Sequence, residues 1–132
     1  MGNHAGYCPT VELSTLGHTW IVDLDGTIVQ HNAYKNLGHD VLLEGAKAFM
    51  ASIPSDDLVI IVTSRTEEYR ETTLRFLYDN GIAFDHIVFG APYGERVVVN
   101  DIKPGGLKTA IALNVARDAG FPEELVKYRD DL

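Results

Sequence analysis

Cysteine and long apolar runs are both scarce in this sequence. Cys8 is the one cysteine among 132 residues, so no disulfide can form within the chain and no thiolate cluster can hold a metal. A chain with a single cysteine suits a reducing compartment, and we therefore expect a cytoplasmic protein. No apolar stretch approaches the roughly 20 residues that a membrane-spanning helix needs, so we expect no membrane partner.

Positive charge is also scarce. The chain has 11 Lys and Arg residues against 19 Asp and Glu residues, and its formal net charge is −8. An acidic chain is a poor general binder of nucleic acid or of anionic lipid, so the composition disfavours nucleic acid as a partner. A local basic pocket remains compatible with this charge.

The length and apolar content predict one folded domain. At 132 residues and 45% hydrophobic residues, the chain can bury a single sizeable core. Residues 1–9 lack the basic and then apolar order of a signal peptide, and we expect a flexible N-terminal tail there. The expected domain comprises residues 10–132.

Strands and helices alternate along the expected domain. Unbroken apolar runs predict strands, apolar residues at helical spacing predict helices, and residues 10–16 could add a short strand. The expected strands are 19–24, 56–63, 86–90 and 96–101, and the expected helices are 42–53, 66–80 and 107–120. This alternation predicts an α/β fold, with a Rossmann-like parallel sheet in three layers and helices on both faces.

Polar residues follow three of the expected strands. Asp23 and Asp25 end the first, residues 63–65 (Thr-Ser-Arg) end the second, and Asn100 and Asp101 end the fourth. Ligands of parallel sheets bind outside the carboxyl ends of the strands. We therefore expect the functional site at this edge.

The residue types at this edge predict metal and phosphate chemistry. Three carboxylates, from Asp23, Asp25 and Asp101, suit a hard cation such as Mg²⁺. One carboxylate could attack phosphorus and form an aspartyl-phosphate, and another could transfer a proton. The Thr63 hydroxyl and the N–H groups that follow it could bind a phosphoryl oxygen.

Three stretches resemble the motifs of the haloacid dehalogenase superfamily. They are IVDLDGT, VIIVTSR and VVVND, in the order and spacing of that family. The resemblance implies a phosphatase in which Asp23 is the nucleophile and Asp25 the general acid and base. It also implies that Mg²⁺ is held by the Asp23 and Asp101 side chains and the Asp25 backbone carbonyl.

The expected phosphate-binding residues lie in the first two motifs. Thr63 matches the hydroxyl that binds the phosphoryl group in the family. The full expected set is Gly26, Thr63, Ser64 and Arg65.

Two departures from the family pattern concern charge. Asn100 stands where many relatives carry an Asp, and the segment GAPYGE lacks the Lys of the third motif. We expect Lys103, two residues after Asp101, to supply the missing cation, with Arg65 as second candidate. Arg96 is excluded, because it would begin the fourth strand at the opposite edge of the sheet.

The spacing leaves no room for a cap domain. About 30 residues separate Thr27 from the second strand, and one short helix fits there. An open site predicts a large substrate or a homo-oligomer whose neighbouring subunit covers it. The chain is most similar to small capless phosphatases of capsular polysaccharide biosynthesis, which implies a sugar phosphate or another surface-polysaccharide precursor as substrate.

Two alternatives remain open at the level of sequence. The domain could bind Mg²⁺ or a phosphorylated partner without turnover, or it could act on a nucleotide or a nucleic-acid end. A receiver domain is rejected, because Thr63 and Ser64 end the strand that would carry the phospho-acceptor Asp.

Overall fold

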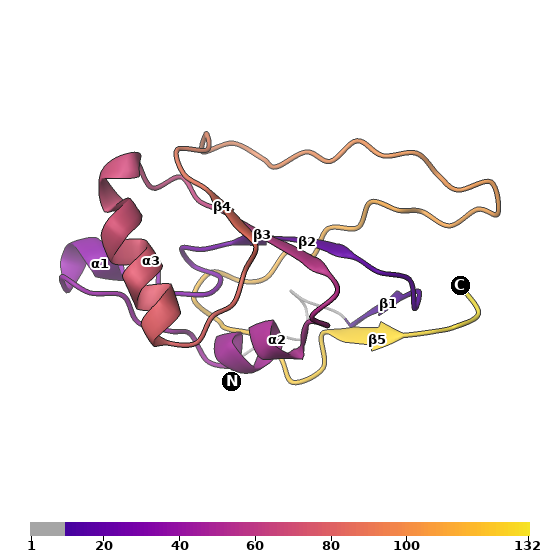
Figure 1. The fold of residues 1–132 in the computed structure, drawn as a ribbon, viewed down its shortest axis with the longest axis horizontal. Coiled ribbons are helices and arrows are strands. Elements are labelled where there is room, and N and C mark those ends of the chain that lie inside the picture. Colours follow the sequence, from indigo (N-terminus) through magenta and orange to yellow (C-terminus); the bar gives the residue numbers. More distant parts are fainter. Residues whose placement is uncertain (1–9) are drawn as a thin grey trace.

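A computed structural model describes residues 10–132; the expected tail, residues 1–9, lies outside the described residues. Its main sheet has the parallel order β2-β3-β4, formed by Thr19–Asp23, Leu58–Val62 and His86–Val88 (Figure 1). Asp23 lies beside Val62, and Val62 beside Val88. The first three expected strands are confirmed, and their carboxyl ends share one edge.

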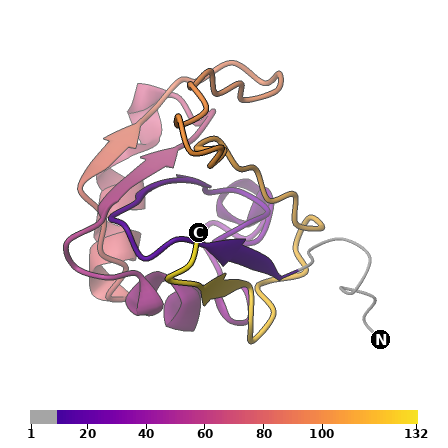
Figure 2. The ribbon, with the colours of Figure 1, turned by 90° about the vertical axis from the view of Figure 1, so that its right-hand side faces the viewer.

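One face of this sheet carries the core. Helices α2 (Ala46–Ser52) and α3 (Arg70–Asp79) contribute to a cluster of buried apolar side chains. Its members are Val22, Leu24, Ile28, Val29, Ala46, Met50, Val59, Ile61, Leu77 and Ile82. Alternate strand positions point to the other face, where Ile21 is 53% exposed. The expected three-layer arrangement is therefore not confirmed, although the fold is α/β with parallel strands (Figure 2).

A second, two-stranded sheet lies apart from the first. β1 (Val11–Leu13) pairs in parallel with β5 (Val126–Tyr128). The short strand expected within residues 10–16 is confirmed, whereas β5 was not predicted. The segment that leads to β5 is hydrogen-bonded to the residues just before α2: the Phe121 N–H donates to the Glu44 carbonyl at 2.8 Å. Gly120 has φ +81° here, and a Cβ at that position would collide with the Glu44 carbonyl.

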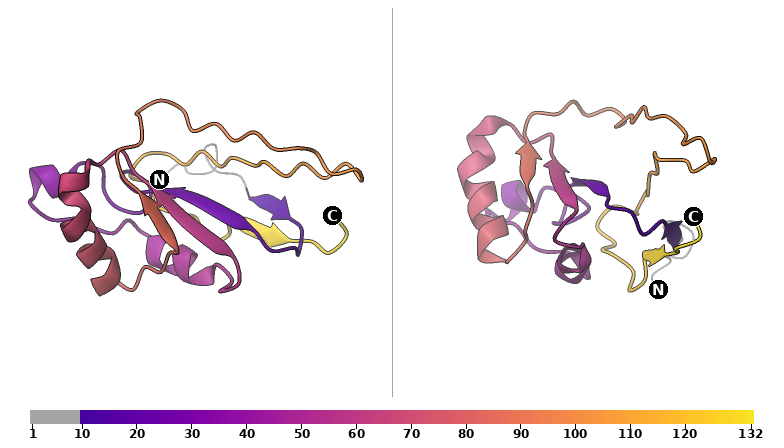
Figure 3. Two further views of the ribbon diagram at one scale, coloured as in Figure 1. Left: turned by 45° about the horizontal axis from the view of Figure 1, so that its top comes forward. Right: turned by 45° about the vertical axis from the view of Figure 1, so that its right-hand side comes forward.

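The expected strand 96–101 and the expected helix 107–120 are wrong. Residues 92–117, which we name the arm, form a long, mostly exposed excursion that turns back at residues 103–107 (Figure 3). Local contacts between its two legs replace the expected pairing. Ile102 bridges to Lys108, and the Asn100 side chain donates to Thr109 at 2.6 Å.

No inserted domain covers the carboxyl ends of the strands. The one helix between β2 and α2 is α1 (Ala33–Asn36), and η2 (Glu67–Tyr69) and α3 fill the connection from β3 to β4. The expected absence of a cap is thus confirmed for residues 10–132. In the same part of the chain, the helices are all too short to cross a bilayer.

Candidate active site

The loop after β2 is a tight turn that fixes the first motif. The Leu24 carbonyl accepts the N–H groups of Thr27, Ile28 and Val29, at 2.9–3.2 Å. Gly26 has φ +86°, a conformation that side chains disfavour. The Thr27 hydroxyl donates to Asp23 Oδ2 at 3.2 Å, so the turn holds the Asp23 carboxylate in place.

Arg96 lies against Asp23. Its Nη1 donates to Asp23 Oδ1 at 3.1 Å and to the Val62 carbonyl at 3.4 Å. The two side chains keep 34% and 42% of their surfaces exposed, so a ligand can reach both. The exclusion of Arg96 from the site is wrong, because it depended on a strand at 96–101 that the structure does not contain.

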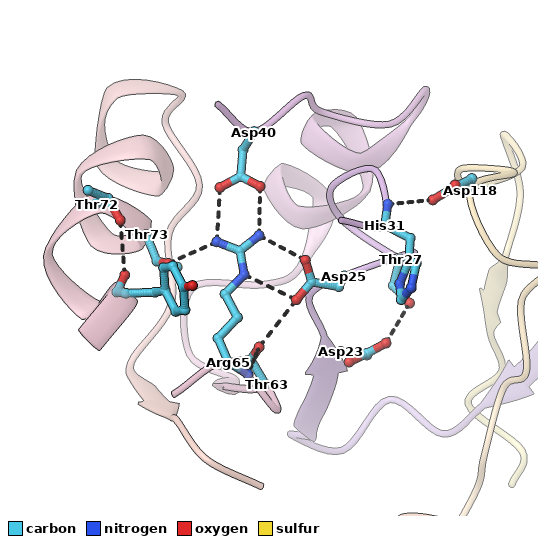
Figure 4. A network of polar contacts seen from close by, with 11 residues as sticks. Asp23, Asp25, Thr27, His31, Asp40, Thr63, Arg65, Thr72, Thr73 and Asp118 are labelled. Atoms are coloured by element: carbon cyan, nitrogen blue, oxygen red, sulfur yellow. Dashed lines mark hydrogen bonds and ion pairs between the residues drawn. The ribbon is translucent and has the colours of Figure 1, made fainter. Parts of the chain in front are cut away.

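Arg65 forms the buried centre of the site (Figure 4). Its Nε and Nη2 donate to the two oxygens of Asp25 at 3.1 and 2.8 Å. Its Nη1 and Nη2 donate to the two oxygens of Asp40 at 3.0 and 2.6 Å, and Nη1 also donates to Thr73 at 2.9 Å. All five N–H donors of the guanidinium are therefore used.

The environment of Arg65 keeps it charged. Burial alone would lower the pKa of Arg65, but the hydrogen bonds to Asp40 and Asp25 raise it well above its usual value. The guanidinium also stacks on the Tyr34 ring, 3.8 Å from the centroid. The pKa of Tyr34 is raised, first by burial and then by the Asp25 charge.

The Arg65 network bears on the expected roles of two residues. All side-chain N–H groups of Arg65 have protein partners, so it could bind a phosphate only after one of these bonds breaks, and its phosphate-binding role stays a prediction. Both Asp25 oxygens accept from Arg65, and the carboxylate is turned toward Arg65 rather than toward Asp23 (Figure 4). Asp25 is thus held as an ion-pair partner.

Thr63 and Ser64 lie at the expected edge. The buried Thr63 hydroxyl accepts the Arg65 N–H at 3.1 Å and donates to Asp25 Oδ2 at 3.4 Å. Ser64 donates to the Pro92 carbonyl at 3.4 Å, where the arm begins. Their phosphate-binding roles, like that of Gly26, stay predictions.

Sequence reasoning missed three members of the network. Asp40, Thr73 and Tyr34 contact Arg65 from a loop and two helices that no motif marks. Thr73 lies within the expected helix 66–80, but nothing in that pattern indicates that its hydroxyl meets a guanidinium. One signal was available for Arg65, since it directly follows the polar end of β3.

The structure does not bring Asp101 or Lys103 to this edge. Both are exposed, Lys103 lies in the turn of the arm, and Figure 1 shows this turn far from the carboxyl end of β2. Lys103 forms no ion pair within residues 10–132. In that range no three acidic, His or Cys side chains gather to hold a metal, so the residues as placed do not fit Mg²⁺.

The return leg of the arm ends against the first motif. The Asp118 N–H donates to the Gly26 carbonyl at 2.9 Å, and its carboxylate accepts the His31 N–H at 2.8 Å. The Arg117 side chain packs against Gly26. Both ends of the arm are therefore fastened near the site.

These features define a capless α/β protein whose parallel sheet presents an exposed Asp–Arg pair at its carboxyl edge. No protein-family model matches the chain, and no curated protein matches it. Two solved structures are similar at 26% identity and a TM-score of 0.49: "Structure of Pnkp1/Rnl/Hen1 complex" over 63% of this chain, and "Structure of the Pnkp1/Rnl/Hen1 RNA repair complex" over 67%. The alignments cover 31% of the chains matched. Likeness at this level establishes neither a shared fold nor a shared activity.

Proposed function

We propose that this chain is a phosphatase of the haloacid dehalogenase type, which hydrolyses phosphate monoesters through an aspartyl-phosphate on Asp23. The observation that carries the proposal is the pair of Asp23 and Arg96, joined at 3.1 Å and accessible at the carboxyl edge of the sheet. A carboxylate nucleophile needs a nearby cation that can bind the phosphoryl oxygens, and this pair supplies both groups.

The proposed reaction has two displacements. An Asp23 oxygen attacks phosphorus and forms the new O–P bond, the ester P–O bond breaks, and the leaving oxygen takes a proton from water and departs as the alcohol. Water then attacks the same phosphorus, which releases inorganic phosphate and a proton and restores the Asp23 carboxylate.

Arg96 binds the phosphate in this scheme. Its guanidinium can form two parallel hydrogen bonds to phosphate oxygens, an interaction stronger than its single bond to Asp23 Oδ1. Moving from Asp23 to the phosphate frees the nucleophile and neutralises part of the charge that would repel it. Arg96 therefore takes the role that sequence analysis gave to Lys103.

Proton transfer by Asp25 requires a rearrangement. Its carboxyl would have to leave the Arg65 guanidinium before it could donate a proton to the alcohol. This arrangement also favours the alternative function, a domain that binds a phosphorylated partner without turnover. In a binding domain, Asp25 would serve only as the ion-pair partner of Arg65.

The substrate class stays broad. The absence of a cap in residues 10–132 leaves the Asp23 edge open, which suits an ester with a large alcohol group. We propose a sugar phosphate or another surface-polysaccharide precursor in the cytoplasm, with a nucleotide or a nucleic-acid end as the alternative.

Turnover of an aryl phosphate separates the two functions. We expect the wild-type protein to release phosphate from para-nitrophenyl phosphate, and the same assay run with Mg²⁺ and with EDTA measures whether the reaction needs a metal ion. A phosphate-release panel of sugar phosphates, nucleotides and 3′- or 5′-phosphorylated oligonucleotides then identifies the alcohol. Binding of phosphorylated compounds without any turnover would support the binding domain instead.

A further inference from the structure

A cavity of about 520 Å³ lies between α2 and residues 121–128, the segment that includes β5. Figures 1 and 2 show α2 and β5 side by side. Trp20, near the amino end of β2, lines the cavity, whereas Asp23 ends the same strand about 10 Å further along. Small-molecule sites typically measure roughly 300–1,000 Å³. The cavity therefore has the size of a ligand site and is separate from the Asp23 edge.

Aromatic rings form much of the wall of this cavity. Phe49 stacks on Phe121 with 4.5 Å between ring centroids, and Trp20 meets Phe49 edge-on at 5.8 Å. These three rings are half-buried, and the exposed Tyr128 is the fourth ring of the lining. The face of an aromatic ring carries partial negative charge and attracts cations. A wall with four rings therefore suits a ligand that is positively charged.

The indole of Trp20 is hydrogen-bonded to a buried carboxylate. Its Nε1 donates to Asp57 Oδ2 at 2.9 Å, and Asp57 is 8% exposed. Where water is largely excluded, a carboxylate at the indole N–H polarises the ring and makes its face more negative. Because an indole is already the best aromatic partner for a cation, Trp20 should be the strongest of the four rings.

The charged residues that line this cavity in the described part of the chain are all glutamates: Glu44, Glu123 and Glu124. All three are exposed. Glu124 lies 3.7 Å from the Lys127 ammonium, whereas Glu44 and Glu123 form no ion pair within residues 10–132. The opening therefore has a negative potential that complements a cation, in a chain whose formal net charge is already −8.

The hydrogen-bonding groups of the lining indicate which kind of cation fits. The Trp20 N–H is used by Asp57, and the Ser52 hydroxyl donates to the Phe49 carbonyl. A primary ammonium or a guanidinium gives up hydrogen bonds to water when it enters a cavity, and it needs acceptors in exchange. A quaternary ammonium has no N–H groups, and its methyl groups can pack directly on ring faces.

We propose that this cavity binds a small organic cation with a quaternary ammonium head, which lies against the Trp20 and Phe121 rings with Glu44 and Glu123 at the opening. Binding there needs no phosphate chemistry, so the proposal does not depend on the phosphatase function. Because Asp23 lies at the other end of β2, Asp23→Asn should bind the cation as the wild type does.

Tryptophan fluorescence tests the site directly, because Trp20 is the one tryptophan of the chain. The probes are choline and 3,3-dimethylbutan-1-ol, which have the same shape but differ in a charged nitrogen and a neutral carbon. We expect choline to change the Trp20 emission saturably, with a Kd of about 1 mM, the scale of a few cation–π contacts. At equal ionic strength, the neutral alcohol should bind at least about tenfold more weakly. Equal affinities, or no saturable change with choline, would overturn the proposal.

Charge-matched variants test the glutamates at the opening. A chain with Glu44→Gln and Glu123→Gln loses two negative charges beside the cavity, and its affinity for choline should fall about tenfold. A chain with Glu71→Gln and Glu95→Gln loses two exposed negative charges elsewhere, and its affinity should stay within about twofold of wild type. Equal losses in the two chains would mean that only net charge matters, and the proposed site would be rejected.

Ring variants test the cation–π contacts. Phe121→Leu keeps an apolar side chain but removes one ring face, and choline should bind about fivefold more weakly with an unchanged circular dichroism spectrum. If Phe121→Leu does not fold, Tyr128→Leu applies the same test at an exposed ring. Choline affinity that is unchanged in the folded variants would contradict binding against these rings.

Mass and activity measurements complete the design. By light scattering, a dimer whose Trp20 emission does not respond to choline would show that a second copy covers the cavity, and it would overturn the proposal. An active phosphatase that does not bind choline would reject this site alone. A protein that binds choline but hydrolyses no phosphate ester would retain this site and reject the phosphatase.

Discussion

Arg96 and Lys103 carry the same charge seven residues apart, but the structure places Arg96 at Asp23 and Lys103 near the turn of the arm. At the residue scale, this difference decides which cation serves the site. The Arg96→Met change keeps an unbranched side chain and removes the charge. We expect kcat/KM for an aryl phosphate to fall about a hundredfold, the scale of losing one preorganised charge.

Two matched variants make that measurement specific. Lys127→Met removes an exposed cation on β5, and kcat/KM should stay within about twofold of wild type. A hundredfold loss in Lys103→Met with normal turnover in Arg96→Met would contradict the assignment and return the role to Lys103.

The nucleophile gives a second prediction at this scale. Asp23→Asn keeps the shape of the side chain and its Thr27 hydrogen bond, while removing the attacking charge. Hydrolysis should fall by several orders of magnitude, with an unchanged circular dichroism spectrum. Residual activity within about tenfold of wild type would exclude Asp23 as the nucleophile.

The sequence is enough to predict where the site lies, but it does not predict which side chains contact one another there. The apolar runs before Asp23 and Thr63 are enough to place both at one edge, because parallel strands align their carboxyl ends. The partners of Arg65 come from a loop and two helices, and their approach depends on packing that no local pattern encodes. Arg96 was misplaced because the apolar run at residues 97–99 predicts a strand, whereas the structure leaves this run unpaired in the arm.

At the element scale, Arg65 joins the carboxyl end of β3 to the loop after β2, to the loop of Asp40 and to α3. Arg65→Met would leave the Asp40 carboxylate buried without its cation, since that side chain is 6% exposed. We expect the free energy of unfolding to fall by about 3 kcal/mol or more in urea denaturation. Arg65→Lys should recover little of it, because an ammonium cannot form two bidentate pairs.

A control on α3 separates the effect of the Arg65 hydrogen bonds from the effect of removing one positive charge. Arg75→Met removes an exposed cation from α3 and should change the free energy of unfolding by less than about 0.5 kcal/mol. Equal losses for Arg65→Met and Arg75→Met would mean that the buried ion pairs contribute nothing beyond net charge.

Gly26 gives a prediction about the turn after β2. At φ +86°, a Cβ is strained and would lie 3.2 Å from Arg117 Cγ. Gly26→Ala should therefore lower the free energy of unfolding by about 1–2 kcal/mol, measured by urea denaturation. Gly105→Ala in the arm, at an open position without a positive φ, should be neutral within about 0.5 kcal/mol. Equal effects at the two glycines would contradict the strain argument.

At the scale of the whole molecule, the arm is a long, mostly exposed segment without a helix or strand. Lys108 is exposed in its return leg, so trypsin should cut after Lys108 before it cuts the sheet. Mass spectrometry of a short digestion should therefore find the cut after Lys108 among the first products. First cuts within β2, β3 or β4 would contradict this argument from exposure.

Both ends of the arm are fastened to the body. The Ala91 N–H donates to the Thr63 carbonyl, and the Asp118 N–H donates to the Gly26 carbonyl. Beyond Asp118, β5 pairs with β1 and Phe121 binds Glu44. The segment after the arm therefore has its own attachments to the body, and a break in the arm does not detach it. We therefore expect that two pieces divided near residue 105 can reassemble, and that reconstitution of the β1–β5 pair could then serve as a split reporter.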